Sequence, residues 1–587
     1  MLKLFRFLKP YWWQVIILIF STVVQVYTTL MLPALMADII NKGIVPGDIN
    51  HIWFIGLQMV GMAVLSAIAS LISSYFSARV GANFARDLRV AVFTKIINLN
   101  ILDTKDFSTA SLITRTTNDV SQVQNVVIMM LAMMLRAPLF CIISIALAIQ
   151  TAPDMSWIIL VGAAAILGSV ALIMSLVMPK FKIFQDFVDK ITLLTRENLT
   201  GLRVIRAFNN EDLEKKKFIK TNDALTKLLI FIDKVLELQN PLINIIFNGT
   251  TLLCSWVGIS LLSKDFAYLG NMTAFAQYVT HVMMSFLMMS MLFVMLPRAN
   301  VSAHRINDVL KIMPKITWRN KTHGIPDKTP SIEFKNVDFI YPEAAEKVLD
   351  NISFKAKAGE TTAFIGSTGS GKSTLINLVP RFYEASSGEI FINGLPIKDY
   401  EKKDLMGRIG FVPQRGVLFS GTIKSNIKFG APNATDEQVH KAAEIAQAKN
   451  FIEKLPEKYN SHIAQGGTNV SGGQKQRLSI ARAICKNPDI FIFDDAFSAL
   501  DMKTDRKLRD ALKEITGDAV VLIVAQRVST IKDADEIVVL NNGKIVGKGK
   551  HLELLTTCPV YQEIVKSQLS DKEYTVELKL AEKRAHD

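Results

Sequence analysis

The stretch Gly366-Ser-Thr-Gly-Ser-Gly371-Lys372-Ser373 lies between the apolar run TTAFI (361–365) and the apolar, helix-like run TLINLV (374–379). Glycines at this spacing let backbone N–H groups close around phosphate oxygens, Lys372 can reach the outer phosphates, and Ser373 can ligate Mg²⁺. A strand before such a loop and a helix after it are the context that this chemistry requires. The nucleotide-binding residues predicted here are Gly366, Ser367, Thr368, Gly369, Ser370, Gly371, Lys372, Ser373 and Thr374.

Two further motifs follow the phosphate loop. In Ile490-Phe-Ile-Phe-Asp494-Asp495 four apolar residues predict a buried strand, and Asp494 stands at its carboxyl end, where α/β proteins bind ligands and where an acid can hold Mg²⁺. In Val470-Ser471-Gly472-Gly473-Gln474 a Ser-Gly-Gly run opens a helix and presents free N–H groups to an anion. Taken alone, this second motif is equally well explained as a helix cap.

From Ser331 onward, short strand-like runs alternate with helical segments. This alternation predicts a soluble α/β domain with a largely parallel sheet. The runs are SIEFKNVDFIY (331–341), TTAFIG (361–366), RIGFVP (408–413), IFIFDD (490–495), VVLIVA (520–525) and EIVVLNNGKIVGKG (536–549).

The preceding half of the 587-residue chain reads as a membrane domain. Half of all residues are hydrophobic, the mean hydropathy is +0.27, and a spanning helix needs about 20 mostly apolar residues. The predicted fold is thus an α-helical transmembrane domain with long cytoplasmic extensions, fused to a nucleotide-binding α/β domain. The six predicted spans are 14–40, 52–78, 121–150, 155–179, 238–263 and 271–297.

The formal net charge of +14 is concentrated between certain spans. The loops 41–50, 151–154 and 263–271 hold few Lys or Arg residues, whereas 79–119 and 180–234 hold many. This asymmetry predicts that the two basic connections, and with them both chain ends, are cytoplasmic in a multi-pass protein of the plasma membrane. It also argues against a nucleic-acid partner, the other common reading of a basic chain.

The sequence predicts four parts along the chain. They are an interfacial elbow helix (1–12) with Trp12 and Trp13 at the membrane surface, a transmembrane domain (13–300), a linker (301–330) and a nucleotide-binding domain (331–587). The four cysteines are far apart in sequence, which predicts buried thiols rather than a disulfide framework or a zinc site.

Together these residues resemble the ATP-binding cassette (ABC) transporters, over nearly the whole chain. The resemblance implies ATP and Mg²⁺ as cofactors, with Ser373, Gln414 and Asp494 around the metal. It implies that Tyr341 stacks on adenine and that the signature motif Ser471, Gly472, Gly473 and Gln474 faces the ATP bound to a second cassette. Asp501, in Ser498-Ala-Leu-Asp501, matches the loop that crosses between cassettes, and segments 107–120 and 206–212 resemble the coupling regions.

Two positions depart from the family pattern. The family normally has glutamate where this chain has Asp495, and histidine where it has Gln526. A carboxylate one methylene shorter retreats from the attacking water, and a shift of about 1 Å can cost roughly 10²-fold in rate. The sequence therefore predicts a site that binds MgATP but hydrolyses it slowly.

Because the signature is intact, we expect a heterodimer in which a second half-transporter supplies the missing Glu and His. The sequence resembles the degenerate-site chain of bacterial heterodimeric multidrug-type ABC exporters, and the resemblance implies this arrangement. A homodimer with two slow sites is the alternative. The expected activity is export of amphipathic compounds, drug-like or lipid-like, through the lipid bilayer; a dedicated lipid, peptide or siderophore transporter and a regulatory ATP clamp remain open.

Several side chains in the predicted spans bear on the cargo. The sixth span is rich in Met and Phe, which suit promiscuous apolar binding but also ordinary packing. Polar residues in the spans are expected to face the interior, where they either line a substrate path or join helices. The residues concerned are Met283, Met284, Met288, Met289, Met291, Met295, Phe286, Phe293, Asn240, Asn244, Asn248, Gln25 and Arg136.

Overall fold

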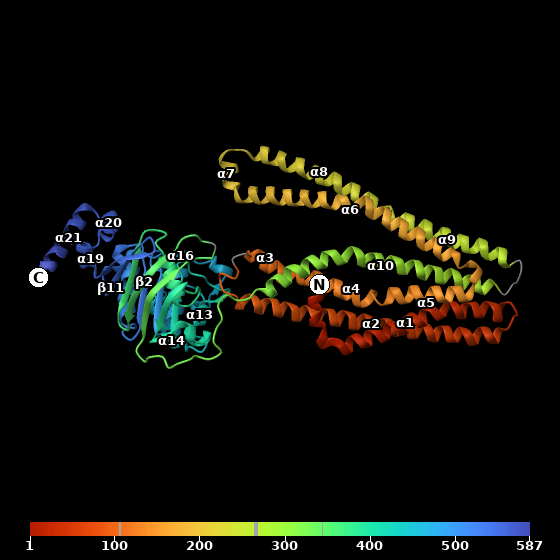
Figure 1. Cartoon of the computed structure of the whole chain (residues 1–587), viewed down its shortest axis with the longest axis horizontal. Coiled ribbons are helices and arrows are strands. Elements are labelled where there is room, and N and C mark those ends of the chain that lie inside the picture. Colours follow the sequence, from red (N-terminus) through yellow and green to blue (C-terminus); the bar gives the residue numbers. More distant parts are fainter. Residues whose placement is uncertain (105–106, 263–267, 343, 587) are drawn as a thin grey trace. The chain divides into compact units, whose positions relative to one another are not determined.

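The computed structural model describes residues 1–104, 107–262, 268–342 and 344–586 (Figure 1). They form two compact units: residues 1–98 with 106–312, and residues 99–105 with 313–587. Of the predicted loop 263–271, residues 263–267 lie outside the described residues, and residues 268–271 form the start of a helix.

The first unit is helical throughout (Figure 1). Helix α2 (Ile49–Asn98) is 50 residues long, which corresponds to about 75 Å at 1.5 Å per residue. This length is more than twice the thickness of a hydrocarbon core, roughly 30 Å. The helices are η1 (Leu2–Tyr11), α1 (Trp12–Asp38), η2 (Ile39–Ile44), α2 (Ile49–Asn98), α3 (Thr109–Thr114), η3 (Arg115–Asp119), α4 (Val120–Met133), α5 (Arg136–Thr151), η4 (Pro153–Met155), α6 (Trp157–Thr200), α7 (Leu202–Ala207), α8 (Glu211–Glu237), α9 (Gln239–Leu262) and α10 (Tyr268–Lys311).

Five stretches of the described residues are long and apolar enough to cross a membrane: Lys3–Ile44, Ile49–Asn98, Thr109–Thr151, Pro153–Thr200 and Glu211–Ser260. The prediction of six spans is therefore not met in number. The sixth, 271–297, lies within α10, whose first turns carry the polar residues Asn271, Gln277 and His281. The structure does not describe the side chains of residues 291–294, which include the predicted Met291 and Phe293.

A cluster of buried side chains from α1, α5, α6, α9 and α10 forms the main core of this unit. Phe275 and Tyr278 of α10 are fully buried in it, and the Tyr278 hydroxyl donates to the Leu30 carbonyl at 3.3 Å. Met283 also belongs to this core, at 2% exposure, whereas Met284 is 46% exposed. Packing in the core thus explains an apolar side chain at Met283, but it does not explain the one at Met284.

Some polar residues of the predicted spans are buried and others are exposed. Gln25 of α1 is buried, as expected. Asn240, Asn244 and Asn248 share one face of α9, but that face is exposed on this chain, so the expectation that they point into its own bundle is wrong. Helix α9 packs against α6 and α10 through its apolar face, which leaves the asparagines on the other side.

The N-terminal helix η1 is attached to helix α2 through the buried side chain of Leu4. Leu4 is fully buried in a cluster with Phe84 and Leu88 of α2, while Trp12 and Trp13 are 66% and 47% exposed. The Tyr11 hydroxyl also donates to Asp87 of α2 at 2.6 Å. Apolar packing and this hydrogen bond therefore fix η1 on α2.

The second unit contains two larger sheets and a two-stranded one. The six-stranded sheet has the order β12-β11-β3-β10-β9-β6, with all neighbours parallel except β11 and β12. An antiparallel sheet has the order β2-β1-β4-β5. The strands are β1 (Ser331–Phe339), β2 (Leu349–Lys357), β3 (Thr361–Gly366), β4 (Ser387–Ile392), β5 (Leu395–Pro396), β6 (Ile409–Val412), β7 (Gly421–Thr422), β8 (His462–Ile463), β9 (Ile490–Asp494), β10 (Val520–Val524), β11 (Glu536–Asn541) and β12 (Lys544–Gly549).

Each of the six strand-like runs in the sequence forms a strand, and the largely parallel sheet is confirmed. Helices pack against this sheet in two cores. They are α11 (Lys372–Leu378), α12 (Lys402–Arg408), α13 (Ile423–Lys428), α14 (Asp436–Ile445), α15 (Lys449–Ile452), α16 (Gly472–Cys485), α17 (Met502–Lys513), α18 (Val528–Ile531), α19 (His551–Thr557), α20 (Pro559–Gln568) and α21 (Asp571–His586). Helices α11 and α12 share one core with β1, β2 and β4, and the later helices form the other. The four cysteines are free and buried, as expected.

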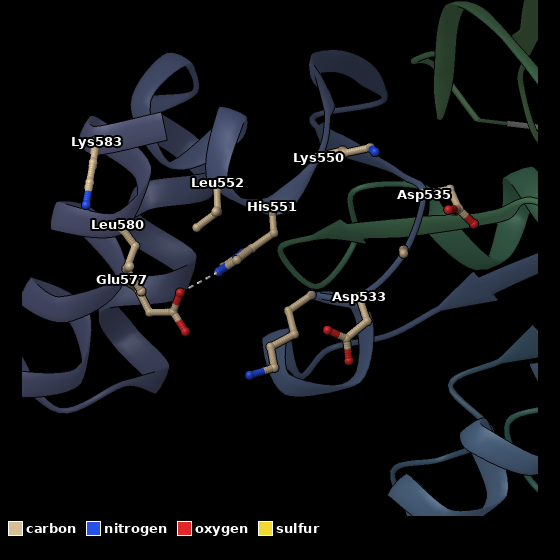
Figure 2. A pocket seen from close by; sticks show the side chains of 10 residues that line it. Asp533, Asp535, Lys550, His551, Leu552, Glu577, Leu580 and Lys583 are labelled. Carbon is tan, nitrogen blue, oxygen red and sulfur yellow. Dashed lines mark ion pairs between the residues drawn. The ribbon is translucent and has the colours of Figure 1, made fainter. Parts of the chain in front are cut away.

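Helices α19 and α21 meet at a cavity of about 580 Å³. Figure 2 shows the His551 ring pointing toward Glu577 of α21, with Nε2 3.4 Å from a carboxylate oxygen. The other ring nitrogen, Nδ1, lies 2.7 Å from the buried Tyr561 hydroxyl of α20. One buried imidazole therefore joins the last three helices.

Candidate functional site

The phosphate loop runs from the end of β3 to α11, and its backbone requires glycine. Gly369 and Gly371 have φ values of 85° and 97°, in the left-handed region. A Cβ on Gly371 would lie 2.8 Å from the Val348 carbonyl oxygen, whereas the space around a Cβ of Gly369 is open to 4 Å. The loop thus keeps free room above Gly369, where a phosphate can approach the backbone.

Lys372 lies across the inside of this loop. Its Nζ donates hydrogen bonds to the carbonyl oxygens of Gly366 at 2.8 Å and Ser367 at 2.7 Å. Burial lowers the pKa of Lys372, and the nearby Asp495 and Asp494 carboxylates oppose that shift. The ammonium group is therefore held ready for an anion that would replace these carbonyl contacts.

Three parallel strands bring the other predicted residues to the same edge. Strand β10 lies between β3 and β9, and Val524 pairs with both Phe364 and Asp494. Because carboxyl ends of parallel strands share one edge of a sheet, the phosphate loop and the acidic pair come together there.

The acid at the end of β9 contacts the loop serine. The Ser373 hydroxyl donates to Asp494 Oδ1 at 2.9 Å. Burial raises the pKa of Asp494, and the neighbouring Asp495 carboxylate raises it further, while the Ser373 hydrogen bond lowers it. A hydroxyl and a carboxylate oxygen side by side are ligands that Mg²⁺ prefers, so this pair fits the metal.

Asp495 has an unusual backbone. Its φ is 49°, in the left-handed region, and its N–H donates to the Val524 carbonyl at 2.9 Å. Asp and Asn tolerate this region better than most residues. Burial raises the pKa of Asp495, and a hydrogen bond from Gln414 opposes the shift. The carboxylate therefore points into the site from a backbone conformation that suits aspartate.

Gln414 approaches Asp495 from the segment after β6. Its Nε2 donates to Asp495 Oδ2 at 3.3 Å. The flanking backbone is tied to α16 by the buried Gln476, which donates to the Pro413 carbonyl and accepts from the Gly416 N–H, both at 3.0 Å. The glutamine next to the site and the helix of the signature motif are thus linked within this chain.

Aromatic rings lie on one side of the phosphate loop. The Tyr341 hydroxyl lies 3.0 Å from Thr374 Oγ1 of α11. Phe339 and Tyr383 meet the Tyr341 ring in edge-to-face geometry, with centroids 4.8 and 5.5 Å away. These contacts fix the Tyr341 ring beside the phosphate loop.

A cavity of about 390 Å³ joins these parts. Of the predicted residues it is lined by Tyr341, Thr368, Gly369, Gly371, Lys372, Ser373, Thr374, Gln414, Asp495 and Gln526, and also by Val348 and Val524, which were not predicted. A lysine, open loop glycines, the Ser373–Asp494 oxygens and an aromatic ring fit a nucleoside triphosphate with Mg²⁺. Val348 and Val524 carry no sequence signal beyond ordinary apolar runs.

The signature motif does not line this cavity. Ser471 caps α16: its hydroxyl accepts from the Gln474 N–H at 3.3 Å, and Gln474 Oε1 accepts from the Ser471 N–H at 2.9 Å. A Cβ on Gly473 would lie 3.2 Å from the Ala499 carbonyl, next to the segment that ends at Asp501. Asp501 in turn caps α17 by accepting from the Thr504 N–H at 2.9 Å. The motif is both a helix cap and an exposed surface.

Sequence reasoning missed the residue that holds the segment after β10. Gln568, the last residue of α20, donates to the Gln526 carbonyl at 2.7 Å and accepts from the Val528 N–H at 2.9 Å. Gln476 was missed in the same way. Neither residue lies in the cavity, and 42 residues separate Gln568 from Gln526, so no local pattern marks the contact.

Two family models match this chain: the ABC transporter transmembrane region over residues 15–286 and the ABC transporter domain over 349–498. An uncharacterized ABC transporter ATP-binding protein of Mycobacterium tuberculosis is 36% identical, covering 96% of this chain and 97% of its own length. The chain belongs to the ABC transporters, as a half-transporter with one membrane unit and one ATP-binding unit.

Further relatives share this organisation. The Bacillus subtilis protein YfiB, also an uncharacterized ABC transporter ATP-binding protein, is 37% identical over 97% of this chain and 98% of its own. An ATP-dependent lipid A-core flippase of Desulfotalea psychrophila is 30% identical over 96% and 99%. A bacterial Atm1-family ABC exporter solved with ATP bound has the same fold, with a TM-score of 0.79 and 23% identity over 95% of this chain and 98% of that one.

Proposed function

We propose that this chain is a subunit of an ATP-driven exporter that moves amphipathic compounds out of the cell across the plasma membrane. The observation that carries the proposal is the cavity in which Tyr341, Lys372, Gln414 and Asp495 meet, on a chain whose described residues also include five candidate spans. The basic connections favour a cytoplasmic ATP-binding unit and cytoplasmic chain ends.

In this proposal the chain's own residues bind and orient MgATP. The ring of Tyr341 receives adenine, the loop amides and Lys372 hold the phosphates, and Ser373 and Asp494 hold Mg²⁺. The metal, when bound, neutralises charge on the phosphates. Gln414 lies between this site and the backbone that Gln476 ties to the signature helix, so it is placed to relay closure of the site.

We further propose that this site hydrolyses ATP slowly. The Asp495 carboxylate is one methylene shorter than glutamate, accepts a hydrogen bond from Gln414, and lies at a position where burial raises its pKa. Gln526 lines the same cavity and carries no positive charge for a γ-phosphate. Binding groups are thus complete, while the groups for activating water are weakened.

A slow ATP site on a chain whose signature motif is intact favours pairing with a different chain, as a heterodimer. Because Ser471 to Gln474 lie outside the cavity of their own chain, they are free to complete the site of a second cassette. The partner would be a half-transporter with Glu and His at the two altered positions. A homodimer with two slow sites is the alternative.

Affinity purification of the full chain from its native membrane, followed by mass identification, tests the partner. A stoichiometric second half-transporter with the missing Glu and His is the expected result. Recovery of this chain only with itself would overturn the heterodimer and leave the homodimer.

Cargo class is tested by deletion of the chain in whole cells. Loss of dye or drug efflux supports an amphipath exporter, and unchanged retention and resistance contradict it. The 30% identity to a protein named as a lipid A-core flippase favours lipid as the second candidate cargo, and a lipid-flipping assay in proteoliposomes addresses it directly.

A further inference from the structure

Two charged side chains lie inside the predicted spans, Asp38 and Arg136. Asp38 lies near the end of its span and pairs with Lys42 and His51, whereas Arg136 lies deeper. Arg136 is the only Asp, Glu, Lys or Arg among residues 12–37, 49–78, 120–151, 157–179, 239–262 and 268–297. An ionised group at membrane depth is expensive, and such residues generally pair with a partner or serve function. The question is therefore what anion this arginine meets.

The position of Arg136 along its helix places it within the hydrocarbon thickness. It is the first residue of α5, which has 16 residues and ends at Thr151 before the turn at Pro153. At 1.5 Å per residue, Arg136 lies about 22 Å from that turn, against a hydrocarbon core of about 30 Å. Pro138 lacks an N–H to continue the helix from α4, which explains why the helix is interrupted here.

Within the described residues, Arg136 has no ionic partner. Its Nε is buried without a hydrogen bond, and its one described contact is the ring of Phe140, 5.5 Å from the guanidinium carbon. Phe140 is itself buried and stacks on His281 of α10, with centroids 5.5 Å apart. The guanidinium is thus held at the α5–α10 contact by an aromatic ring, which leaves its donors available.

The same face of α10 supplies apolar surface. Met284 and Met288 follow His281 at spacings of three and seven residues, so they share its side of the helix. Met284 is 46% exposed although it lies between buried neighbours. A cation on α5 and flexible, polarisable thioethers on the helix α10 that packs against it match a molecule with an acidic head and an apolar body.

We propose that Arg136 binds the acidic head group of an amphipathic cargo, a phosphate or carboxylate, while Met284 and the neighbouring face of α10 receive its apolar part. This rests on the proposed function as an amphipath exporter and narrows its cargo to anions. A guanidinium can meet such a group with two parallel hydrogen bonds, which are stronger in a dry site than in water.

The test uses the full chain, with any partner that co-purifies, in nanodiscs of neutral lipid. Two fluorescent probes share one twelve-carbon chain and fluorophore and differ only in the head, a phosphate monoester or a glycerol. Their dissociation constants are measured for the wild type, Arg136→Gln, Arg136→Lys and the control Arg79→Gln. Arg79 is exposed and bonds Tyr75 on its own helix, so its loss leaves the α5–α10 contact intact.

We expect the wild type to bind the phosphate probe at least tenfold more tightly than the glycerol probe. Arg136→Gln should reduce that preference to within twofold, Arg136→Lys should retain most of it, and Arg79→Gln should leave it unchanged. Unchanged MgATP binding and Tm show that Arg136→Gln is folded. If this variant unfolds, Arg136→Met decides, since it keeps an apolar stem of similar length and removes the charged group; it should likewise reduce the preference to within twofold.

Equal affinity of the wild type for both probes would overturn the inference while leaving amphipath export standing. So would an unchanged preference in Arg136→Gln. If that variant instead loses its partner chain, Arg136 pairs with a carboxylate across the subunit contact and the inference is wrong. Failure of the wild type to bind either probe would count against the amphipath exporter itself.

Discussion

The side-chain amide of Gln414 donates a hydrogen bond to the carboxylate of Asp495 across 3.3 Å. This contact joins the segment after β6 to the second of the two acids at the end of β9. Gln476 holds the same segment to the helix that begins at the signature motif. A change at the ATP site and a change at the signature surface are therefore mechanically connected inside one chain.

Asp495→Glu combined with Gln526→His should raise ATP hydrolysis at this site by about tenfold to hundredfold, because the carboxylate then reaches the attacking water. Turnover is measured in the complete transporter with the partner's acid changed to Gln, so that only this site reports. Asp495→Asn is the matched control: it keeps a residue that tolerates φ of 49° but removes the charge, and it should not raise turnover. Equal hydrolysis rates in the unchanged chain, the double variant and Asp495→Asn would contradict the proposal that Asp495 and Gln526 slow this site.

Gln568→Met should uncouple the segment after β10 from α20 while preserving side-chain volume. It removes both the donor to the Gln526 carbonyl and the acceptor for the Val528 N–H. In the Asp495→Glu, Gln526→His background we expect kcat to fall about tenfold with KM for ATP within twofold. Gln568→Glu keeps the acceptor alone and should be intermediate; a change in KM without a change in kcat would show that Gln568 serves binding instead.

Ser471→Arg should leave MgATP binding to this chain within twofold and lower the ATPase rate of the assembled transporter more than tenfold. The side chain lies outside its own cavity, so bulk and charge there disturb only a site on another cassette. Ser471→Ala serves as control, because it removes the cap on α16 at a cost of about 1 kcal/mol without adding bulk. Nucleotide binding that falls in both variants alike would point to a structural role only.

Acidification should weaken the contact between the last helices. Burial lowers the pKa of His551, with Lys532 lowering it and Glu577 and Asp533 opposing the shift. A histidine with a folded pKa below its unfolded value of about 6.5 takes up its proton first in the unfolded state. Its contribution to stability is complete above about pH 6.5 and is lost as pH falls toward the folded pKa.

The measurement is Tm of the full chain at pH 7.5 and 5.5, for the wild type and His551→Gln. From pH 7.5 to pH 5.5 the Tm of the wild type should fall further than the Tm of His551→Gln, because the variant has no titrating group at this position. A difference of equal size in both proteins would show that other groups carry the acid sensitivity.

The sequence alone determined the parts of this protein whose signals are local. The loop at Gly366–Ser373, the apolar strand before Asp494 and the long apolar helices follow from spacing and composition within a few residues, because backbone conformation and apolar burial are read over short windows. The family resemblance built on those residues holds over nearly the whole chain.

Tertiary structure decided what depends on distant residues. Strands β2 and β4 were not among the predicted runs; both pair with β1, which lies elsewhere in the sequence, and β4 also pairs with β5. The contacts of Gln568 with Gln526, and of Gln476 with Pro413, join residues 42 and 63 positions apart, so no local pattern could reveal them. Which helix faces pack decided that Asn244 is exposed and that Phe140 stacks on His281 of α10, because burial is settled by neighbouring helices rather than by a residue's own polarity.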